Sequence, residues 1–451
     1  MRIWLLSLCL GVFVHGSMAS AQGTDSFDPS GYWTGAIIKR DSVLPVEIEI
    51  EVEGEELTAT TLFPDWYFYR PSKPEQVRKT DRGLVIKDLL DGDAVLELEP
   101  RFEQLFGTVG DDGSRLHLKR SPRPPRALVT TSDTAFTSAD GTRIAGTLTL
   151  PEFGEAMAGI VMVRGRGCAS RVNGKARFLA EYGIAVLTYD KRGAGQSEGD
   201  CATFTFDQLT QDATAALDHL AAHSKTDPAR IGMMGESAGA WIIQAVAERQ
   251  RQQENAVNPA FLVTWIGPAT SIIQQQVSSA ASYGAAAGLS EEQQGLLAEV
   301  SRIIVDPRLS DDEAFAKLDP IRRKAEAEGW RDTGFGGDDI PRTRADMPML
   351  WLRRFRYDPT AFFKTLGDLP YLAVFGAKDP IVPVDENIAA LRNTGTDVEI
   401  VSLSESGHGY DFDERTVTLP SGRDVVLFEG PDTGFITSTV TFLRGRGFLT
   451  R

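Results

Sequence analysis

Short apolar segments alternate with amphipathic stretches from about residue 128 to the end of the chain. Between two of these segments, residues 206–223 place Leu209, Ala213 and Leu217 on one helical face. Buried strands that alternate with helices are typical of a mostly parallel sheet with helices on both sides. We therefore expect an α/β domain over residues 128–451. Its predicted strands lie at residues 160–163, 184–189, 230–234, 261–266, 371–375 and 398–403.

The alternation stops between about residues 270 and 345. Ser290 is followed by Gln293, and Ser310 by Glu313, which is the spacing of capping boxes that begin helices. We expect a helical insertion here, between two strands, that forms a cap over the sheet.

Residues 27–120 have a different pattern, which predicts a small antiparallel β domain. Residues 46–52 alternate apolar and acidic side chains, as a half-buried strand does. Asp-Gly pairs at residues 91–92 and 112–113 are typical of hairpin turns. A proline-rich linker at residues 121–127 separates this domain from the α/β domain.

The first 21 residues have the features of a secretory signal peptide. Arg2 precedes an apolar run at residues 3–14, and Ala19-Ser20-Ala21 offers an A-x-A cleavage site. The run is shorter than the roughly 20 residues that span a bilayer. We expect export to the periplasm or the extracellular space, with no membrane span in the mature chain.

The composition limits the partners. The formal net charge is −16, so nucleic acid and anionic membranes would repel the chain. With 42% hydrophobic and 24% charged residues, the chain resembles a globular enzyme rather than a disordered protein.

Residues 235–239 read Gly-Glu-Ser-Ala-Gly and match the G-x-S-x-G pattern of a nucleophile elbow. The elbow residues Gly235, Glu236 and Gly239 surround Ser237, with an apolar strand before them and an apolar helix after them. A second G-x-S-x-G contains Ser197, but polar residues follow it and no helical pattern begins there. We therefore predict Ser237 as the nucleophile.

Histidine is the usual base for such a serine, and the chain has five. His408 lies between two glycines directly after the last predicted strand, where a base can be positioned. The other four are less suitable. His15 lies in the signal peptide and His117 in the β domain; His219 and His223 have helical spacing without a third metal ligand nearby. We expect no metal.

An acid is expected between the serine and the histidine. Asp379 follows the strand at residues 371–375, where its carboxylate could orient the imidazole of His408. Asp385 and Glu405 are weaker alternatives. The chain order Ser237, Asp379, His408 is the hydrolase order.

These motifs resemble the α/β-hydrolase superfamily, and within it bacterial carboxylesterases related to serine aminopeptidases and dienelactone hydrolases. The resemblance covers the catalytic domain well and the N-terminal domain poorly. It implies cleavage of a small-molecule carboxylic ester through an acyl-enzyme without a cofactor, with small peptides or thioesters as the alternative. It also implies a structural role for Ser197. The matching segments are residues 235–239, 376–383, 407–408 and the D-x-R-G-x-G-x-S run at 190–197.

One segment departs from the family pattern. Members often have H-G-S-G or H-G-G-G where residues 164–168 read Arg-Gly-Arg-Gly-Cys. The resemblance implies an oxyanion hole formed by the backbone N–H groups of Arg166 and Ala238. The side chains of Arg164 and Arg166 either bind an anionic part of the substrate or pair with acidic residues.

Cys168 and Cys201 are the two cysteines left after signal-peptide removal. In the fold that the chain resembles, they follow neighbouring strands at the catalytic edge, and export favours disulfides. We expect a disulfide between them, with two free thiols as the alternative.

Two other classes of protein are conceivable. Residues 160–167 and Asp190 partly match a dinucleotide-binding fingerprint. This interpretation leaves the elbow, the acid and His408 unexplained. A catalytically inactive binding protein would not need an intact serine, acid and histidine.

Overall fold

The computed structural model describes residues 27–449, except for 40–41, 55, 65–73, 90–91, 100–102, 112, 125–127, 153, 334–339, 396, 413–414 and 429. The predicted signal peptide lies outside this range, as does part of the predicted linker. Within the range, no helix is both long and apolar enough to cross a bilayer.

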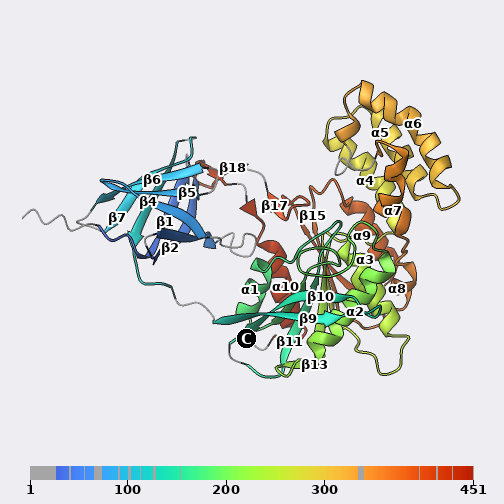
Figure 1. Cartoon of the computed structure of the whole chain (residues 1–451), viewed down its shortest axis with the longest axis horizontal. Coiled ribbons are helices and arrows are strands. Elements are labelled where there is room, and N and C mark those ends of the chain that lie inside the picture. Colours follow the sequence, from blue (N-terminus) through green and yellow to red (C-terminus); the bar gives the residue numbers. More distant parts are fainter. Residues whose placement is uncertain are drawn as a thin grey trace, which may run out of the picture.

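The N-terminal domain is a closed antiparallel barrel (Figure 1). Neighbouring strands pair in chain order, and the first strand closes the barrel on the last. The alternating pattern places Trp33, Ile48 and Leu96 inside. Its strands are β1 (Gly31–Lys39), β2 (Ser42–Glu53), β3 (Glu56–Leu62), β4 (Pro74–Lys79), β5 (Gly83–Leu89), β6 (Gly92–Glu99), β7 (Gln104–Val109) and β8 (Ser114–Arg120).

The second domain is built on an eight-stranded sheet in the order β16-β15-β14-β13-β11-β12-β10-β9. From β11 to β16 all neighbours are parallel, while β10 is antiparallel to β12 and β9. The predicted α/β fold is confirmed. The strands are β9 (Val129–Thr137), β10 (Arg143–Pro151), β11 (Met157–Val163), β12 (Ala185–Tyr189), β13 (Thr226–Glu236), β14 (Leu262–Trp265), β15 (Tyr371–Gly376) and β16 (Val398–Leu403).

Helices cover both faces of this sheet, each over its own apolar core. On one face, α1 (Gly174–Glu181) and α10 (Gly434–Gly445) bury Leu179 and Phe435. The other face is covered by α2 (Phe206–Ala221), α3 (Gly239–Gln250), α8 (Thr360–Lys364) and α9 (Val384–Asn393). Because parallel strands are buried on both faces, these strands read as continuous apolar runs in the sequence.

A helical insertion connects β14 to β15. Both predicted capping boxes are present, and they begin α5 and α6. In Figure 1 the long helices of the insertion form a separate layer beyond one end of the sheet. The insertion contains α4 (Ile272–Ala286), α5 (Glu291–Val305), α6 (Asp311–Ala327), the 3-10 turns Arg331–Thr333 and Arg344–Met349, and α7 (Trp351–Arg354).

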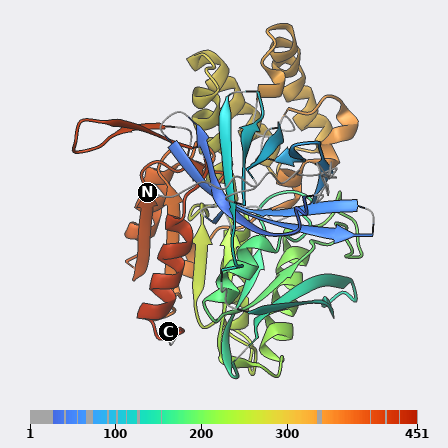
Figure 2. The same cartoon turned by 90° about the vertical axis from the view of Figure 1, so that its left-hand side faces the viewer.

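A hairpin between His408 and α10 reaches the barrel. It consists of β18 (Arg415–Thr418) and β19 (Asp424–Leu427), flanked by the short pair β17 (Asp411–Phe412) and β20 (Gly430–Pro431). Strand β19 contacts β2, and Phe428 packs against the barrel core. Figure 2 views the molecule from the barrel side, with the blue barrel strands in front of the green and yellow sheet.

Candidate active site

Ser237 occupies a strained turn between β13 and α3. Its φ is +49°, in the left-handed region that residues other than glycine rarely adopt. Its N–H is held by the carbonyl of Trp265 at 3.0 Å. A Cβ on Gly235 would lie 2.6 Å from the carbonyl oxygen of Gly239, and a Cβ on Gly239 would meet the backbone of Val163. Both glycines of the G-x-S-x-G motif are therefore required sterically.

The structure brings together the three residues predicted from the sequence. His408 Nε2 lies 3.1 Å from Ser237 Oγ, and His408 Nδ1 lies 2.7 Å from Asp379 Oδ2. The second carboxylate oxygen of Asp379 accepts the N–H groups of Ile381 and Val382 at 2.7 and 3.0 Å. The Asp379 side chain is almost wholly buried, whereas that of His408 is 20% exposed. A serine, an imidazole and a carboxylate thus form one continuous hydrogen-bonded chain.

The two weaker acidic alternatives occupy other positions. Glu405 forms an ion pair with Lys378 at 2.6 Å, and Asp385 lies in the first turn of α9. It is Asp379, not Glu405 or Asp385, that lies within hydrogen-bonding distance of His408 Nδ1.

The residues of the predicted oxyanion hole border a cavity beside the nucleophile. A Cβ on Gly165 would lie 3.0 Å from the Ser237 Cβ, so the loop after β11 passes close to the elbow. Gly165, Arg166 and Ala238 line a cavity of about 510 Å³ between the sheet and the cap. The cap thus lies over the catalytic side of the domain.

The cavity combines an aromatic wall with several charges. Its apolar lining includes Phe204, Phe206, Trp241, Leu350, Trp351 and Phe355. Its charged lining includes Arg166, Lys191, Arg331, Arg342, Asp346 and Arg354. The guanidinium of Arg166 lies 5.0 Å from the centre of the Trp351 ring, a cation–π contact that joins the loop after β11 to the cap.

A buried ion pair lies next to the elbow. Lys175 Nζ is 2.7 Å from Glu236 Oε1, and both side chains are less than 10% exposed. The Lys175 ammonium also lies 4.0 Å from the centre of the Tyr410 ring, and burial raises the pKa of Tyr410 well above its usual value. Arg164 Nε is buried and has no hydrogen-bond partner among the described residues. Sequence reasoning missed Lys175 and Tyr410 because no local pattern links them to Glu236.

The second G-x-S-x-G is part of a structural network. Ser197 Oγ accepts the N–H of Ala145 at 2.9 Å and donates to the carbonyl of Asp190 at 2.8 Å. Asp190 accepts hydrogen bonds from the backbone N–H groups of Arg171 and Gln196 at 2.7 and 2.9 Å. The acidic residue of the dinucleotide-binding pattern is therefore already hydrogen-bonded within the protein.

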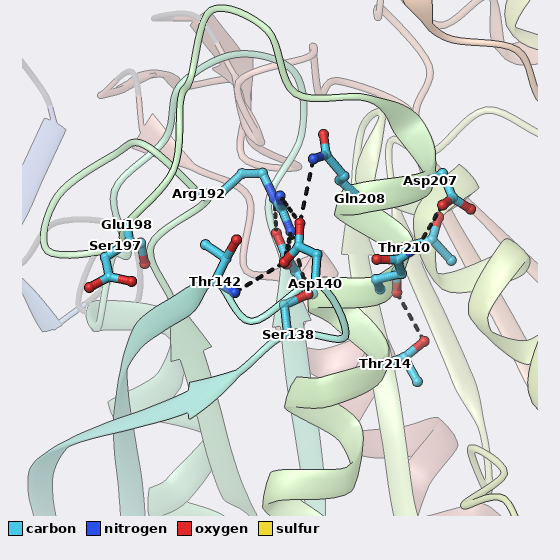
Figure 3. A network of polar contacts seen from close by, with 12 residues as sticks. Ser138, Asp140, Thr142, Arg192, Ser197, Glu198, Asp207, Gln208, Thr210 and Thr214 are labelled. Atoms are coloured by element: carbon cyan, nitrogen blue, oxygen red, sulfur yellow. Dashed lines mark hydrogen bonds and ion pairs between the residues drawn. The ribbon is translucent and has the colours of Figure 1, made fainter.

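Arg192 of the same segment ties the loop before β10 to α2. It contacts Asp212 at 2.6 Å and Asp140 at 2.8 Å, as Figure 3 shows for Asp140. Its hydrogen bond to Asp140 holds the pKa of that carboxyl below its usual value. Asp190, Arg192 and Ser197 thus all have structural partners, in agreement with the role that the resemblance implies for Ser197.

The remaining predicted residues are placed as follows. Cys168 and Cys201 are paired as a disulfide with their Cα atoms 5.6 Å apart, which joins the loops after β11 and β12. His219 Nε2 lies 2.8 Å from Thr134 Oγ1. No group of three or more His, Cys, Asp and Glu side chains suited to a metal ion occurs in the described part of the chain.

The sheet order, the elbow and the helical insertion define an α/β-hydrolase fold. Residues 154–303 match the family model of the serine aminopeptidases, S33. The match begins just before β11 and ends within the cap, so it contains the elbow.

Several solved structures are similar to the chain at low sequence identity. No curated protein matches it. An esterase from Pyrococcus furiosus is 16% identical, with a TM-score of 0.41, and the match covers 73% of this chain and 97% of the esterase. An acetyl xylan esterase from Paenibacillus sp. R4 is 16% identical, with a TM-score of 0.39, covering 69% of this chain and 84% of that chain. The α/β hydrolase GrgF from Penicillium sp. sh18 is 16% identical, with a TM-score of 0.41, covering 71% and 98%.

Proposed function

We propose that the protein is a serine hydrolase that cleaves carboxylic esters through an acyl-enzyme on Ser237. The observation that carries this proposal is the hydrogen-bonded chain from Ser237 Oγ through His408 to Asp379. Neutral His408 donates Nδ1–H to Asp379, so that Nε2, which contacts Ser237 Oγ at 3.1 Å, is the acceptor of the serine proton. A serine so activated attacks an ester carbonyl.

The reaction has two steps. In acylation, the Ser237 Oγ–carbon bond forms while the proton moves to His408 Nε2; the ester C–O bond then breaks as His408 protonates the leaving alcohol. In deacylation, water loses a proton to His408 and attacks the acyl carbon, and the carboxylic acid leaves as Ser237 regains its proton. We propose that the backbone N–H groups of Arg166 and Ala238 stabilise the oxyanion in both steps. Both residues border the cavity beside Ser237.

The charges of the cavity favour an ester over a peptide with a free amino terminus. A carboxylate is the side chain that pairs most strongly with a free ammonium group, through charge-assisted hydrogen bonds. Among the described lining residues the only acid is Asp346, whose Oδ2 accepts the N–H of Thr343 at 2.7 Å. Of the cations in the same lining, Arg331 and Arg342 form ion pairs with Asp332. Arg354 forms no ion pair with the described residues and would repel a charged amine.

A substrate panel tests the proposed function. Purified protein is assayed against p-nitrophenyl esters of increasing acyl length, the matching thioesters and aminoacyl p-nitroanilides, beside Ser237→Ala. We expect turnover of esters by the wild type alone, and covalent labelling of Ser237 by a fluorophosphonate. Turnover of the anilides in preference to esters would make the protein a peptidase. No labelling would indicate a protein without an active nucleophile.

We further propose that the protein acts outside the cytoplasm after cleavage behind Ala21. This proposal rests on the basic, apolar and small-residue order of residues 1–21. Mass determination of the protein recovered from the periplasm or the medium tests it, because a chain that begins at Gln22 is expected. A full-length chain retained in the cytoplasm would contradict it.

A further inference from the structure

Lys191 is a buried lysine at the edge of the proposed oxyanion hole. It follows β12, is 3% exposed, and lines the cavity beside Gly165 and Arg166. Its Nζ donates a hydrogen bond to the backbone carbonyl of Gly165. This contact joins a charged side chain to the loop that carries a proposed oxyanion donor.

The carbonyl of Gly165 and the N–H of Arg166 belong to the same peptide group. Resonance keeps that group planar, and in the trans form the C=O and the N–H point in opposite directions. A cation bound to the oxygen therefore limits rotation of the plane and fixes the direction of the N–H. It also withdraws electron density through the amide, which makes the N–H a stronger donor.

The charge of Lys191 is available for this effect below about pH 7, where the ammonium form predominates. Among the described residues it forms no ion pair, and its Nζ has the Gly165 carbonyl as its hydrogen-bond partner. Burial, with a smaller contribution from the positive charge of Arg164, lowers the pKa of Lys191 to about 7. An ammonium without a neighbouring carboxylate gains stability when negative charge develops close by.

The backbone around Lys191 is held at several points. Its own N–H donates to the carbonyl of Ala169 at 3.1 Å, on the same loop as Gly165. The disulfide between Cys168 and Cys201 joins the two loops again. These contacts fix the position of Lys191 relative to the loop that contains Gly165.

We propose that Lys191 is a positioning residue of the oxyanion hole, which orients and polarises the peptide group between Gly165 and Arg166. The proposal rests on the proposed ester hydrolysis at Ser237. Lys191 does not touch the reacting atoms; it acts through the N–H of Arg166.

The test compares Lys191→Met, which removes charge and donor, with Lys191→Gln, which keeps a neutral donor. Each variant is assayed with a p-nitrophenyl ester and with its thiono analogue, in which the carbonyl oxygen is sulfur. Sulfur accepts hydrogen bonds weakly, so the thiono substrate depends less on the oxyanion hole. For Lys191→Met we expect kcat on the ester to fall about 10-fold with KM unchanged, less than the roughly 10²–10³ lost with a whole oxyanion donor. The ratio of kcat on the ester to kcat on the thionoester should fall by a similar factor. For Lys191→Gln we expect both kcat and this ratio to lie between the values for Lys191→Met and the wild type.

Lys175→Met is the matched control, because it removes a second buried ammonium near the elbow. It should lower the thermal midpoint while leaving the ester-to-thionoester ratio unchanged. A folded Lys191→Met with wild-type kcat and ratio would overturn the proposal, and so would an equal loss on both substrates. If Lys191→Met does not fold, an unchanged ratio in Lys191→Gln would overturn it as well. Failure of the proposed function is distinct, since the wild type itself would then not turn over esters.

Discussion

The carboxylate of Asp379 is held by both oxygens: Oδ2 lies 2.7 Å from His408 Nδ1, and Oδ1 accepts two backbone N–H groups. The two residues follow neighbouring parallel strands, β15 and β16, which pair in register from Tyr371 with Val398 onward. A carboxylate fixed in this way holds the imidazole in one tautomer and one orientation.

Ser237→Ala is expected to abolish ester turnover, because it removes the nucleophile. The protein should stay folded, because the Ser237 side chain lies at a turn beside the cavity. Ser197→Ala is the matched control from the second G-x-S-x-G. It loses hydrogen bonds to Ala145 and Asp190, each worth about 1 kcal/mol, but should keep most of the activity. Steady-state kinetics and thermal unfolding of both variants check this, and an inactive Ser197→Ala would mean that the wrong elbow was chosen.

Asp379→Asn should lower kcat by about 10⁴-fold, because the amide stabilises the wrong imidazole tautomer. Glu405→Gln, which affects the ion pair with Lys378, is the control and should be close to wild type. If kcat of Asp379→Asn were close to that of the wild type, another carboxylate would have to orient His408.

The disulfide predicts that exported protein, alkylated without reduction, carries no label on Cys168 or Cys201. The two residues are 33 positions apart, a loop whose closure is worth about 3–4 kcal/mol in the chain-entropy model. Cys168→Ser combined with Cys201→Ser should lower the free energy of unfolding by a comparable amount. Two alkylated cysteines per chain, measured by mass spectrometry, would rule out the bridge.

The cap should set the size of the acyl group. Trp351 lines the cavity and packs edge-to-face on Phe355 with ring centres 5.2 Å apart. Trp351→Ala removes part of this wall, so we expect the preferred ester chain length to increase. Trp351→Phe keeps most of the wall and should shift the preference less. An unchanged chain-length profile in folded Trp351→Ala would argue against a role of the cap in selecting substrates.

Glu75 makes barrel stability depend on pH. Burial raises its pKa from 4.5 to about 7, against the opposing effect of the hydrogen bond from Thr61. Between these values the folded state binds more protons than the unfolded state, so this group's contribution to stability falls as pH rises from 4.5 through 7. Glu75→Gln should therefore be more stable than the wild type at pH 8 and similar to it at pH 4. Denaturant unfolding of both proteins at the two pH values tests this. An equal difference in the free energy of unfolding between Glu75→Gln and the wild type at pH 4 and pH 8 would contradict it.

Local patterns in the sequence were sufficient for the class of fold and for the elbow. A buried strand, the Gly-Glu-Ser-Ala-Gly turn and an apolar helix follow one another directly around Ser237, so short-range sterics determine that geometry. The capping boxes at Ser290 and Ser310 likewise depend on residues three positions apart, and both are present.

Contacts between distant segments were decided only by the tertiary structure. Alternating residues predict strands, but closure of the barrel depends on the pairing of β1 with β8 across the whole domain. Asp379 could be ranked above Asp385 and Glu405 from the sequence, but its contact with His408 requires β15 and β16 to be neighbours. The bonds of Lys175 to Glu236 and of Lys191 to Gly165 have no periodic signal, because each joins loops or elements that meet only after the sheet has formed. The sequence by itself determined the elements and their chemistry, while long-range strand pairing decided which side chains meet.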